Sequence, residues 1–298
     1  MKNVMKVFAA GRRLFLPLVI VAHGLALAQP IQVPRYDDAD EYLPSAQKKN
    51  KENARLFLQQ QPEEELFKVA SPRNVLVDVV ANVPKDADVG IVILLGGSGV
   101  LSIVNDRLDR SFSFQPRTRD FWWANKIATF IVDAPSDRLG KDGISDVSWR
   151  AGPEHRTDLK AVLDEVSKRF AGPLVLFGHS NGAHSLGNAA GLDIPNVRAY
   201  LFSSPAHFKA GSAALTQLQY KLPTLVFAHR KDACGSAPAR EVEGFYTGLN
   251  ANTKKLIWME GGFDPISGAC GPFAPHSYFG IEKQVIDAMA SEIRKVVQ

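Results

Sequence analysis

The chain has 298 residues, of which 45% are hydrophobic and 22% are charged, as in a globular protein long enough to bury a sizeable core. Its formal net charge is +4, but residues 1–28 contain four of the 35 Lys and Arg side chains and none of the 31 Asp and Glu side chains. The rest of the chain is therefore neutral. This balance excludes an electrostatic argument for binding nucleic acid or an anionic membrane surface.

Residues 1–28 have the three parts of a cleavable secretory signal peptide. Basic side chains precede an apolar run over residues 14–27, and an Ala-Leu-Ala cleavage motif ends at Ala28. The run is too short to span a membrane, so we predict no membrane span in the mature chain. We predict cleavage after Ala28 and a periplasmic or secreted protein. The paired Arg12 and Arg13 leave the twin-arginine export route open.

Residues 29–64 are polar and charged, without a sustained apolar face, and we predict that they form an N-terminal extension. From residue 65 to residue 298, short apolar runs alternate with amphipathic segments, which is the pattern of a mostly parallel sheet covered by helices. Most of the runs are rich in Val, Ile and Leu without alternation, as in strands buried on both faces. We expect strands over residues 74–80, 91–95, 128–132, 174–177, 199–202, 224–228 and 255–259.

Two segments between and after these runs have helical periodicity. Apolar residues recur at helical spacing from Leu159 to Phe170 and again from Ile281 to Ile293. The fold class that follows is α/β, with a mostly parallel central sheet and helices on both faces. The segment between Phe202 and Thr224 is too short for a large lid domain, so we expect an open site.

A G-x-S-x-G motif, Gly178-His179-Ser180-Asn181-Gly182, directly follows the apolar run 174–177 and precedes small residues that suit a helix. In a strand-to-helix elbow the glycines permit a turn too tight for side chains, so the serine hydroxyl projects from the sheet edge. Ser180 is therefore the predicted nucleophile. We expect His179 and His184, which flank it, to have packing roles, since neither can approach the hydroxyl as a base held by a later carboxylate.

A serine hydroxyl needs a base within hydrogen-bond reach and a carboxylate that orients the base. Because active sites of open α/β sheets lie at the carboxyl ends of the strands, the partners should follow later strands. Asp232 follows the strand at 224–228, where we expect His229 to orient its loop, and His276 follows the strand at 255–259. Asp264 is the alternative acid, although it shares the connection that contains His276.

Residues 65–298 resemble the α/β-hydrolase superfamily, and within it the small exported bacterial serine hydrolases of the esterase type. The resemblance rests on the serine elbow, on the Gly-rich loop Leu95-Gly96-Gly97-Ser98-Gly99, on the segments around Asp232 and His276, and on the run Asp133-Ala134-Pro135-Ser136-Asp137. It implies the α/β-hydrolase fold and a Ser180, Asp232, His276 triad. It says little about the substrate.

The tetrahedral intermediate of such a reaction needs two preorganised N–H donors. The turn supplies one, the backbone N–H of Asn181. We expect the second from the Gly-rich loop after residue 95, at Ser98, with Gly97 and Gly99 as alternatives, although this loop lacks the His that precedes it in related enzymes. The loop could also be only a flexible turn.

Cys234 and Cys270 are the two cysteines, and both lie in the exported part of the chain. An even pair of exported cysteines normally oxidises, so we predict a disulfide rather than two separate buried thiols. Cys234 lies close to Asp232, and Cys270 lies close to His276. A bridge between them would join the loop of the acid to the loop of the base.

The sequence contains fewer signals for the residues that line the substrate pocket. We expect the stretch 111–123 to form one wall. Several cationic side chains follow strand ends and could favour an acidic or carboxylate-bearing substrate, the alternative being a solvated charged rim. The candidate rim residues are Arg117, Arg119, Arg138, His155 and His207.

No segment has the spacing of a dinucleotide loop, a phosphate loop or a metal site, so we predict no cofactor and no metal. The leading hypothesis is an exported serine hydrolase that cleaves a small-molecule carboxylic ester through an acyl-enzyme. A peptidase or amidase with the same triad, and a non-catalytic binding protein with this fold, are the alternatives. Oligomeric state is not encoded in these patterns.

Overall fold

The computed structural model describes residues 64–104, 107–108, 113–207 and 213–297, and the predicted signal peptide and nearly all of the predicted extension lie outside this part. The central feature is an eight-stranded sheet with the strand order β1-β2-β6-β3-β7-β8-β10-β12. β2 runs antiparallel to both β1 and β6, and the remaining neighbours are parallel. The predicted class, α/β with a mostly parallel sheet, is confirmed.

The strands of this sheet follow one another in the chain as β1 (Glu65–Ser71), β2 (Val75–Asn82), β3 (Val89–Leu94), β6 (Ile127–Pro135), β7 (Leu174–His179), β8 (Val197–Ser203), β10 (Thr224–His229) and β12 (Lys254–Met259). Two short ribbons complete the described strands: β4 (Ile103–Val104) with β5 (Arg107–Leu108), and β9 (Gln219–Tyr220) with β11 (Asn250–Ala251).

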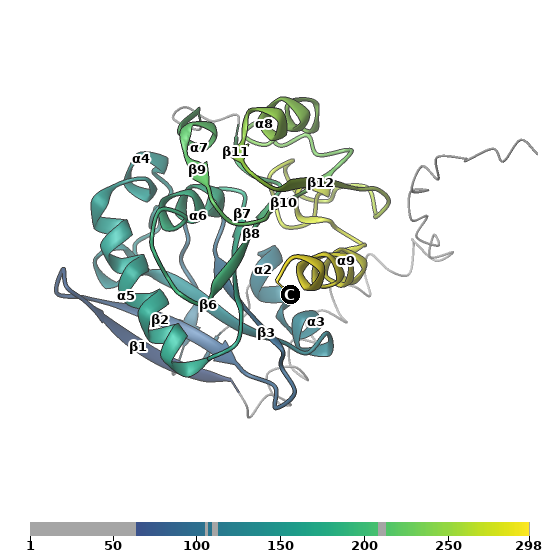
Figure 1. The fold of residues 1–298 in the computed structure, drawn as a ribbon. Helices are drawn as coiled ribbons and strands as arrows, with labels where there is room; N and C mark the ends of the chain where they lie inside the picture. The colour runs from purple at the N-terminus through teal and green to yellow at the C-terminus, as the bar shows by residue number, and fades with distance from the viewer. Residues whose placement is uncertain (1–63, 105–106, 109–112, 208–212, 298) are drawn as a thin grey trace, which may run out of the picture. The chain divides into compact units, whose positions relative to one another are not determined.

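The helices are α2 (Phe114–Arg117), α3 (Arg119–Ala124), α4 (Val147–Arg150), α5 (Pro153–Arg169), α6 (Gly182–Ala189), α7 (Ala213–Gln217), α8 (Val242–Gly248) and α9 (Glu282–Val296), with 3₁₀ turns η1 (Ser136–Arg138), η2 (Ala239–Glu241) and η3 (Pro275–Ser277). α5 and α6 cover one face of the sheet, and α3 and α9 cover the other (Figure 1). None of the helices in the described part of the chain is long and apolar enough to cross a bilayer.

Alternation along the buried strands divides the interior into two cores. In β3, Val92 and Leu94 pack with α5 and α6, whereas Ile91 and Ile93 pack with α3 and α9. All six residues of β3 are buried. A strand with apolar side chains on both faces shows no polar alternation, which is why its sequence is a continuous apolar run.

Every predicted strand is present, with ends that differ by a few residues, and both predicted helices are present as α5 and α9. β1 is the strand of the main sheet that the sequence did not reveal. Its exposed and buried residues alternate, from Glu65 at the start to Ser71 at the end, and it pairs only with β2 at the sheet edge. An edge strand needs no continuous apolar run, so β1 resembled the polar segment before it.

The topology places the loops after β3 and β7 next to each other. β3 lies between β6 and β7, and Leu94 is in register with Gly178. After β3 the next strand of this sheet is β6, its neighbour in one direction of the strand order, and after β7 the next strand is β8, in the opposite direction. The boundary between β3 and β7 is therefore a topological switch point. Crevices at the carboxyl ends of strands at such points are where ligands bind in open α/β sheets.

Candidate active site

Ser180 occupies the sharp turn between β7 and α6 with a left-handed backbone, φ +52°. Its N–H donates to Ser203 O at 3.0 Å, and its carbonyl oxygen accepts from the N–H groups of Ala183 at 3.0 Å and Ala206 at 3.1 Å. A serine in this conformation is strained, and the surrounding hydrogen bonds hold it there. The predicted elbow is therefore present, with the serine half-buried at its tip.

The two glycines of the motif are required by close backbone packing. A methyl group at Gly178 would lie 2.5 Å from the carbonyl oxygen of Gly182, and one at Gly182 would overlap the carbonyl oxygen of Leu94 in β3. Either methyl would push α6 away from the sheet. The motif thus records how tightly the helix behind Ser180 approaches β3.

Asp232 and His276 form a buried hydrogen-bonded pair. Asp232 lies three residues beyond the end of β10, and His276 lies in η3, after the long loop that follows β12. His276 Nδ1 donates to Asp232 Oδ2 at 2.8 Å, and the two side chains are 2% and 1% exposed. Asp264, the rival acid, is exposed. Of the two candidate acids, the structure therefore pairs the histidine with Asp232.

Neighbouring backbone groups fix the carboxylate of Asp232. Its Oδ1 accepts from the N–H of Cys234 at 2.9 Å, and its own N–H donates to His229 O at 3.0 Å. The ring of His229 accepts from Lys231 N–H at 3.0 Å and lies 3.0 Å from Gly261 O. His229 thus holds the Asp232 loop against the loop after β12, as the sequence predicted.

Ser180 and His276 line the same cleft, yet in the described part of the chain no hydrogen bond joins Ser180 Oγ to His276 Nε2. His276 Nε2 is buried and has no hydrogen-bond partner there. Hydrogen bonds between a nucleophile and its base are often long in free enzymes and shorten once substrate is bound. Because Nδ1 is engaged by Asp232, Nε2 is the ring nitrogen that could accept a proton from Ser180.

The Gly-rich loop after β3 is anchored on several sides. Gly96 N–H donates to Gln115 Oε1 at 3.1 Å, and Gly99 N–H donates to Gly96 O at 3.0 Å. Farther along, Leu101 N–H donates to the buried carboxylate of Asp133 at 2.6 Å. The loop is therefore a fixed turn, and the alternative of a merely flexible turn does not describe it.

Of the candidate oxyanion donors, the backbone N–H groups of Gly97, Ser98 and Asn181 have no hydrogen bond among the described residues. Gly99, the third alternative for the second oxyanion donor, uses its N–H within the loop. Among the predicted donors, those left for an anion are thus Asn181 with either Ser98 or Gly97. This set contains both predicted donors.

The cleft has a volume of about 560 Å³. Residues 113–116 of the stretch 111–123 form part of its lining, as the sequence predicted for one wall. Among the lining residues that the structure describes, none is Asp, Glu, Lys or Arg. The polar groups that face the cleft are serine hydroxyls, the side-chain amides of Gln115 and Asn181, and imidazole.

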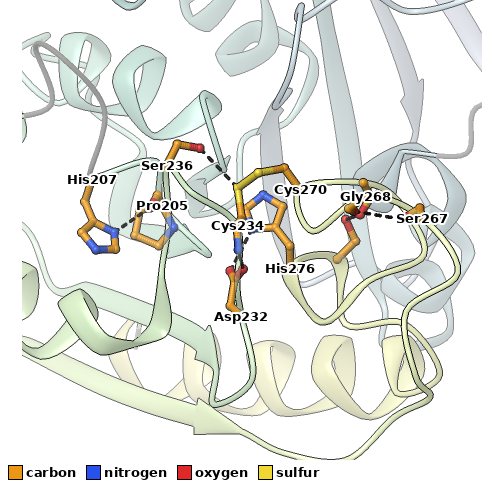
Figure 2. Close-up of a disulfide and its surroundings, with 11 residues drawn as sticks. Pro205, His207, Asp232, Cys234, Ser236, Ser267, Gly268, Cys270 and His276 are labelled. Carbon is orange, nitrogen blue, oxygen red and sulfur yellow. Dashed lines mark hydrogen bonds and ion pairs between the residues drawn. A yellow bond between two sulfur atoms is a disulfide. The ribbon is translucent and has the colours of Figure 1, made fainter.

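A disulfide joins Cys234 to Cys270, and Figure 2 shows it beside the His276–Asp232 pair. Cys234 is buried, whereas Cys270 is exposed and lines the cleft. The predicted bridge is present, and it connects the loop of Asp232 to the segment that leads to His276.

His179, directly before Ser180, packs beside the ring of His276, with their centroids 5.1 Å apart. Its Nδ1 lies 3.1 Å from Ser203 Oγ. Burial lowers the pKa of His179 well below its ordinary value of 6.5, and the positive charges on His276 and Arg117 would lower it further. His179 is therefore a neutral ring that packs beside His276.

Two of the predicted rim arginines form structural ion pairs. Arg117 Nη2 donates to Glu282 Oε1 at 2.8 Å and to Ser277 O at 3.1 Å. Arg119 is largely buried, and its Nε lies 2.5 Å from Glu64 Oε1. Arg117 therefore supports the segment just after the histidine of the pair, and neither guanidinium lines the cleft.

The other three rim candidates also lie outside the cleft lining. The guanidinium of Arg138 lies over the ring of Trp149, 5.1 Å from its centroid. His155 is buried with Nε2 at 2.8 Å from Ser185 Oγ, and His207 Nδ1 lies 2.7 Å from a backbone carbonyl oxygen two residues earlier. Binding of an acidic substrate by these five residues stays a prediction from the sequence, without a contact in support.

Sequence reasoning missed Gln115 and Arg150. Gln115 is 1% exposed and bridges the Gly-rich loop to the end of β3, because its Nε2 donates to Leu94 O at 2.8 Å while its Oε1 accepts from Gly96. Both residues act through contacts with a loop far away in the chain. No local pattern encodes such contacts.

Solved structures provide the comparison, since no protein-family model and no curated protein matches the sequence. A dienelactone hydrolase from Anabaena variabilis is similar with a TM-score of 0.57 and 16% identity, over 80% of this chain and 100% of the other. The Pyrococcus furiosus esterase Pf2001 gives 0.55 and 14%, over 79% and 93%. XC6422 from Xanthomonas campestris, described as an α/β serine hydrolase without lid, gives 0.52 and 16%, over 78% and 95%.

At these identities the likeness concerns the fold. The chain has the α/β-hydrolase fold, with a left-handed serine after β7 and a histidine–aspartate pair contributed by the loops after β12 and β10. The order of these residues along the chain, Ser180, Asp232 and His276, is the order that we expect for this fold from the sequence.

Proposed function

We propose that the protein is a serine hydrolase that cleaves a carboxylic ester. Ser180 attacks the carbonyl carbon, and His276 Nε2 takes the hydroxyl proton and returns it to the leaving alcohol. Asp232 holds the Nδ1–H tautomer of the imidazole. The N–H groups of Asn181 and Ser98 stabilise the oxyanion, and water then cleaves the acyl-enzyme.

The observation that carries this proposal is the 2.8 Å hydrogen bond from His276 Nδ1 to Asp232 Oδ2 in the cleft that Ser180 also lines. A buried carboxylate on Nδ1 leaves Nε2 as the basic nitrogen. The pair is almost completely excluded from solvent, so water does not compete for the hydrogen bond that orients the imidazole. Esterases and other serine hydrolases among the structural neighbours support the same chemistry.

The first test is labelling of the purified protein with a fluorophosphonate, with Ser180→Ala as the control. We expect one covalent adduct on the wild type, identified at Ser180 by peptide mass, and none on the variant. Ser277→Ala is a matched control, because this serine also lines the cleft but lies outside the elbow. A folded wild type that does not react would favour the alternative of a non-catalytic binding protein.

The second test separates ester from amide substrates. A panel of p-nitrophenyl esters of increasing acyl length is compared with the matching p-nitroanilides. We expect turnover of esters at rates at least about 100-fold above those of the anilides, since nitrophenolate is a far better leaving group than nitroaniline. Comparable anilide rates would transfer the assignment to the peptidase alternative, and the acyl-length profile would measure the depth of the cleft.

We also propose that the enzyme is exported after removal of residues 1–28. The disulfide supports this, because such bonds persist in oxidising compartments. Expression of the full chain in a Gram-negative host should give a periplasmic protein whose N-terminus is Gln29. An intact N-terminus on protein recovered from the cytoplasm would contradict the proposal.

A further inference from the structure

Arg150, the last residue of α4, is a buried cation that forms no ion pair with a carboxylate of the described residues. Its side chain is fully enclosed, at 0% exposure, and none of its hydrogen-bond partners in the described part of the chain is a carboxylate. Burial lowers the pKa of the guanidinium to about 9, which still leaves it protonated at neutral pH. An uncompensated buried charge is costly, so its position calls for a specific role.

Each nitrogen of the guanidinium donates to a different partner. Nε donates to Ile144 O at 2.6 Å, Nη1 to Ser185 Oγ at 2.7 Å, and Nη2 to Gly97 O at 3.1 Å. Ser185 also lies 2.8 Å from Nε2 of His155, whose pKa is lowered well below its ordinary value by burial. The neutral ring can accept the hydroxyl proton, which turns the oxygen of Ser185 toward the guanidinium.

The third contact reaches the loop that we propose to hold the oxyanion. Gly97 O accepts from Arg150 Nη2 and also from Asn181 Nδ2, each at 3.1 Å. The next carbonyl, Ser98 O, accepts from Ile144 N–H at 2.8 Å. The carbonyl groups of Gly97 and Ser98 are therefore both held by hydrogen bonds from outside the turn.

Gly97 C=O and Ser98 N–H belong to one planar peptide group and point in opposite directions. Holding the carbonyl in place therefore also fixes the direction of the N–H. Hydrogen bonds accepted by a peptide carbonyl, especially from a cation, polarise the group and make its N–H a stronger donor. The N–H of Ser98 has no hydrogen-bond partner among the described residues and lies at the cleft.

We propose that Arg150 is a positioning residue of the oxyanion hole, which holds and polarises the Gly97–Ser98 peptide through its carbonyl so that Ser98 N–H stabilises the oxyanion. The inference rests on the proposed hydrolase function and names the group that prepares its second donor. The three partners are reached by three different nitrogens of one planar guanidinium, a span that the single nitrogen of a lysine ammonium does not have. Arg150 contacts the peptide from inside the protein and does not line the cleft.

The test compares Arg150→Lys with Arg156→Lys. Arg156 is the matched control, because it also donates to backbone carbonyls on this side of the sheet, those of Asn188 and Gly191, but makes no contact with the loop. We expect Arg150→Lys to lower kcat for an ester by about 10- to 100-fold with KM changed less than about threefold, because the donor acts mainly on the transition state. Arg156→Lys should leave both constants within about twofold of wild type.

A spectroscopic measurement tests the same peptide without relying on turnover. The ¹H–¹⁵N resonance of Ser98 should move to lower proton shift in Arg150→Lys and stay in place in Arg156→Lys. If Arg150→Lys does not fold, Ser185→Ala replaces it, because that variant removes the hydroxyl that accepts from Arg150 Nη1 and loosens the guanidinium without changing its charge.

The outcomes separate the inference from the hydrolase proposal. An active wild type whose kcat and Ser98 resonance are unchanged in Arg150→Lys overturns the inference alone, as does a loss confined to KM. A wild type without hydrolase activity overturns the hydrolase proposal and with it the catalytic role of Arg150. A shifted Ser98 resonance in that case would still support the hold on the peptide.

Discussion

The two halves of the candidate site are held in different ways. Ser180 and the Gly-rich loop are fixed by the sheet itself, through close contact of Gly182 with β3 and a dense set of backbone hydrogen bonds. Asp232 and His276 lie on loops beyond the strand ends, where a disulfide joins the two segments. The half that contains Ser180, the proposed nucleophile, therefore depends on noncovalent packing. The acid–base half, which contains Asp232 and His276 as the proposed acid and base, depends in addition on a covalent link.

Tyr278 shows how the acid–base half is connected to the core. It follows His276 by two residues, has a left-handed backbone with φ +55°, and is fully buried with its hydroxyl 3.0 Å from Ser203 Oγ. The same Ser203 accepts the N–H of Ser180 through its carbonyl. The two halves thus both contact Ser203 at the end of β8, so a change at this residue is expected to affect both.

The largest expected effect comes from removing the charge that orients the base. Asp232→Asn should lower kcat by about 10⁴-fold, because an amide no longer favours the Nδ1–H tautomer or a charged imidazole. Steady-state kinetics with a p-nitrophenyl ester measure the loss. Asp264→Asn is the control and should retain wild-type activity within about twofold. Equal losses in the two variants would remove Asp232 from the mechanism.

Reduction of the disulfide separates the two halves most directly. In the chain-entropy model a bridge with a sequence separation of 36 contributes about 4 kcal/mol to the free energy of unfolding. We expect a reductant titration to abolish ester hydrolysis before it changes the far-UV circular dichroism, because the loops of Asp232 and His276 separate while the sheet stays folded.

The Cys234→Ser/Cys270→Ser double variant controls for other effects of the reductant and should be insensitive to it. It keeps the N–H that Cys234 donates to Asp232 Oδ1. Parallel loss of activity and secondary structure during the titration would show that the bridge supports the whole domain instead of one half of the site.

Packing behind the nucleophile is tested by Gly182→Ala. The added methyl overlaps Leu94 O in the sheet, so we expect a loss of about 3 kcal/mol in the free energy of unfolding, measured with urea. Gly244→Ala is the matched control, because a methyl there meets no atom within 4 Å. That change should be neutral or slightly stabilising, since alanine favours a helix. Equal stability of the two variants would disprove the close approach.

The smallest effect concerns Asp133, which anchors the Gly-rich loop. Burial raises its pKa from 3.8 to about 6, and its Oδ1 accepts from the N–H groups of Leu101 and Ala134. Since the folded state binds the proton more tightly than the unfolded state, this group lowers stability as pH rises from about 4 to about 6. An asparagine can accept the same two hydrogen bonds without a charge.

Asp133→Asn should therefore be more stable than wild type above pH 6, by roughly 1 to 2 kcal/mol, and the difference should shrink toward pH 4. Urea unfolding of both proteins across this pH range measures it. Asp137→Asn, four residues after Asp133 and exposed, is the control and should show no gain in stability above pH 6. A difference that grows as pH falls would have the wrong sign for a raised pKa.

The sequence alone predicted the α/β class, the buried strands and the triad residues, and each for a physical reason. Strands buried on both faces must be apolar throughout, so β3 and β7 are visible as continuous runs. The elbow requires glycine at positions 178 and 182, because a methyl group at either would overlap neighbouring backbone, and this requirement is visible in the sequence as the G-x-S-x-G spacing. Order along the chain then selected Asp232 and His276 after the later strands.

Only the tertiary structure decided which side chains of similar chemistry share a site. The rim arginines follow strand ends as predicted, yet Arg117 and Arg119 pair with glutamates instead of lining the cleft. Arg150 carries no local signal and is found only because α4 packs against the Gly-rich loop. Local patterns fix backbone conformation and burial, which depend on neighbours in the chain, whereas the partners of a long cationic side chain are set by segments brought together in folding.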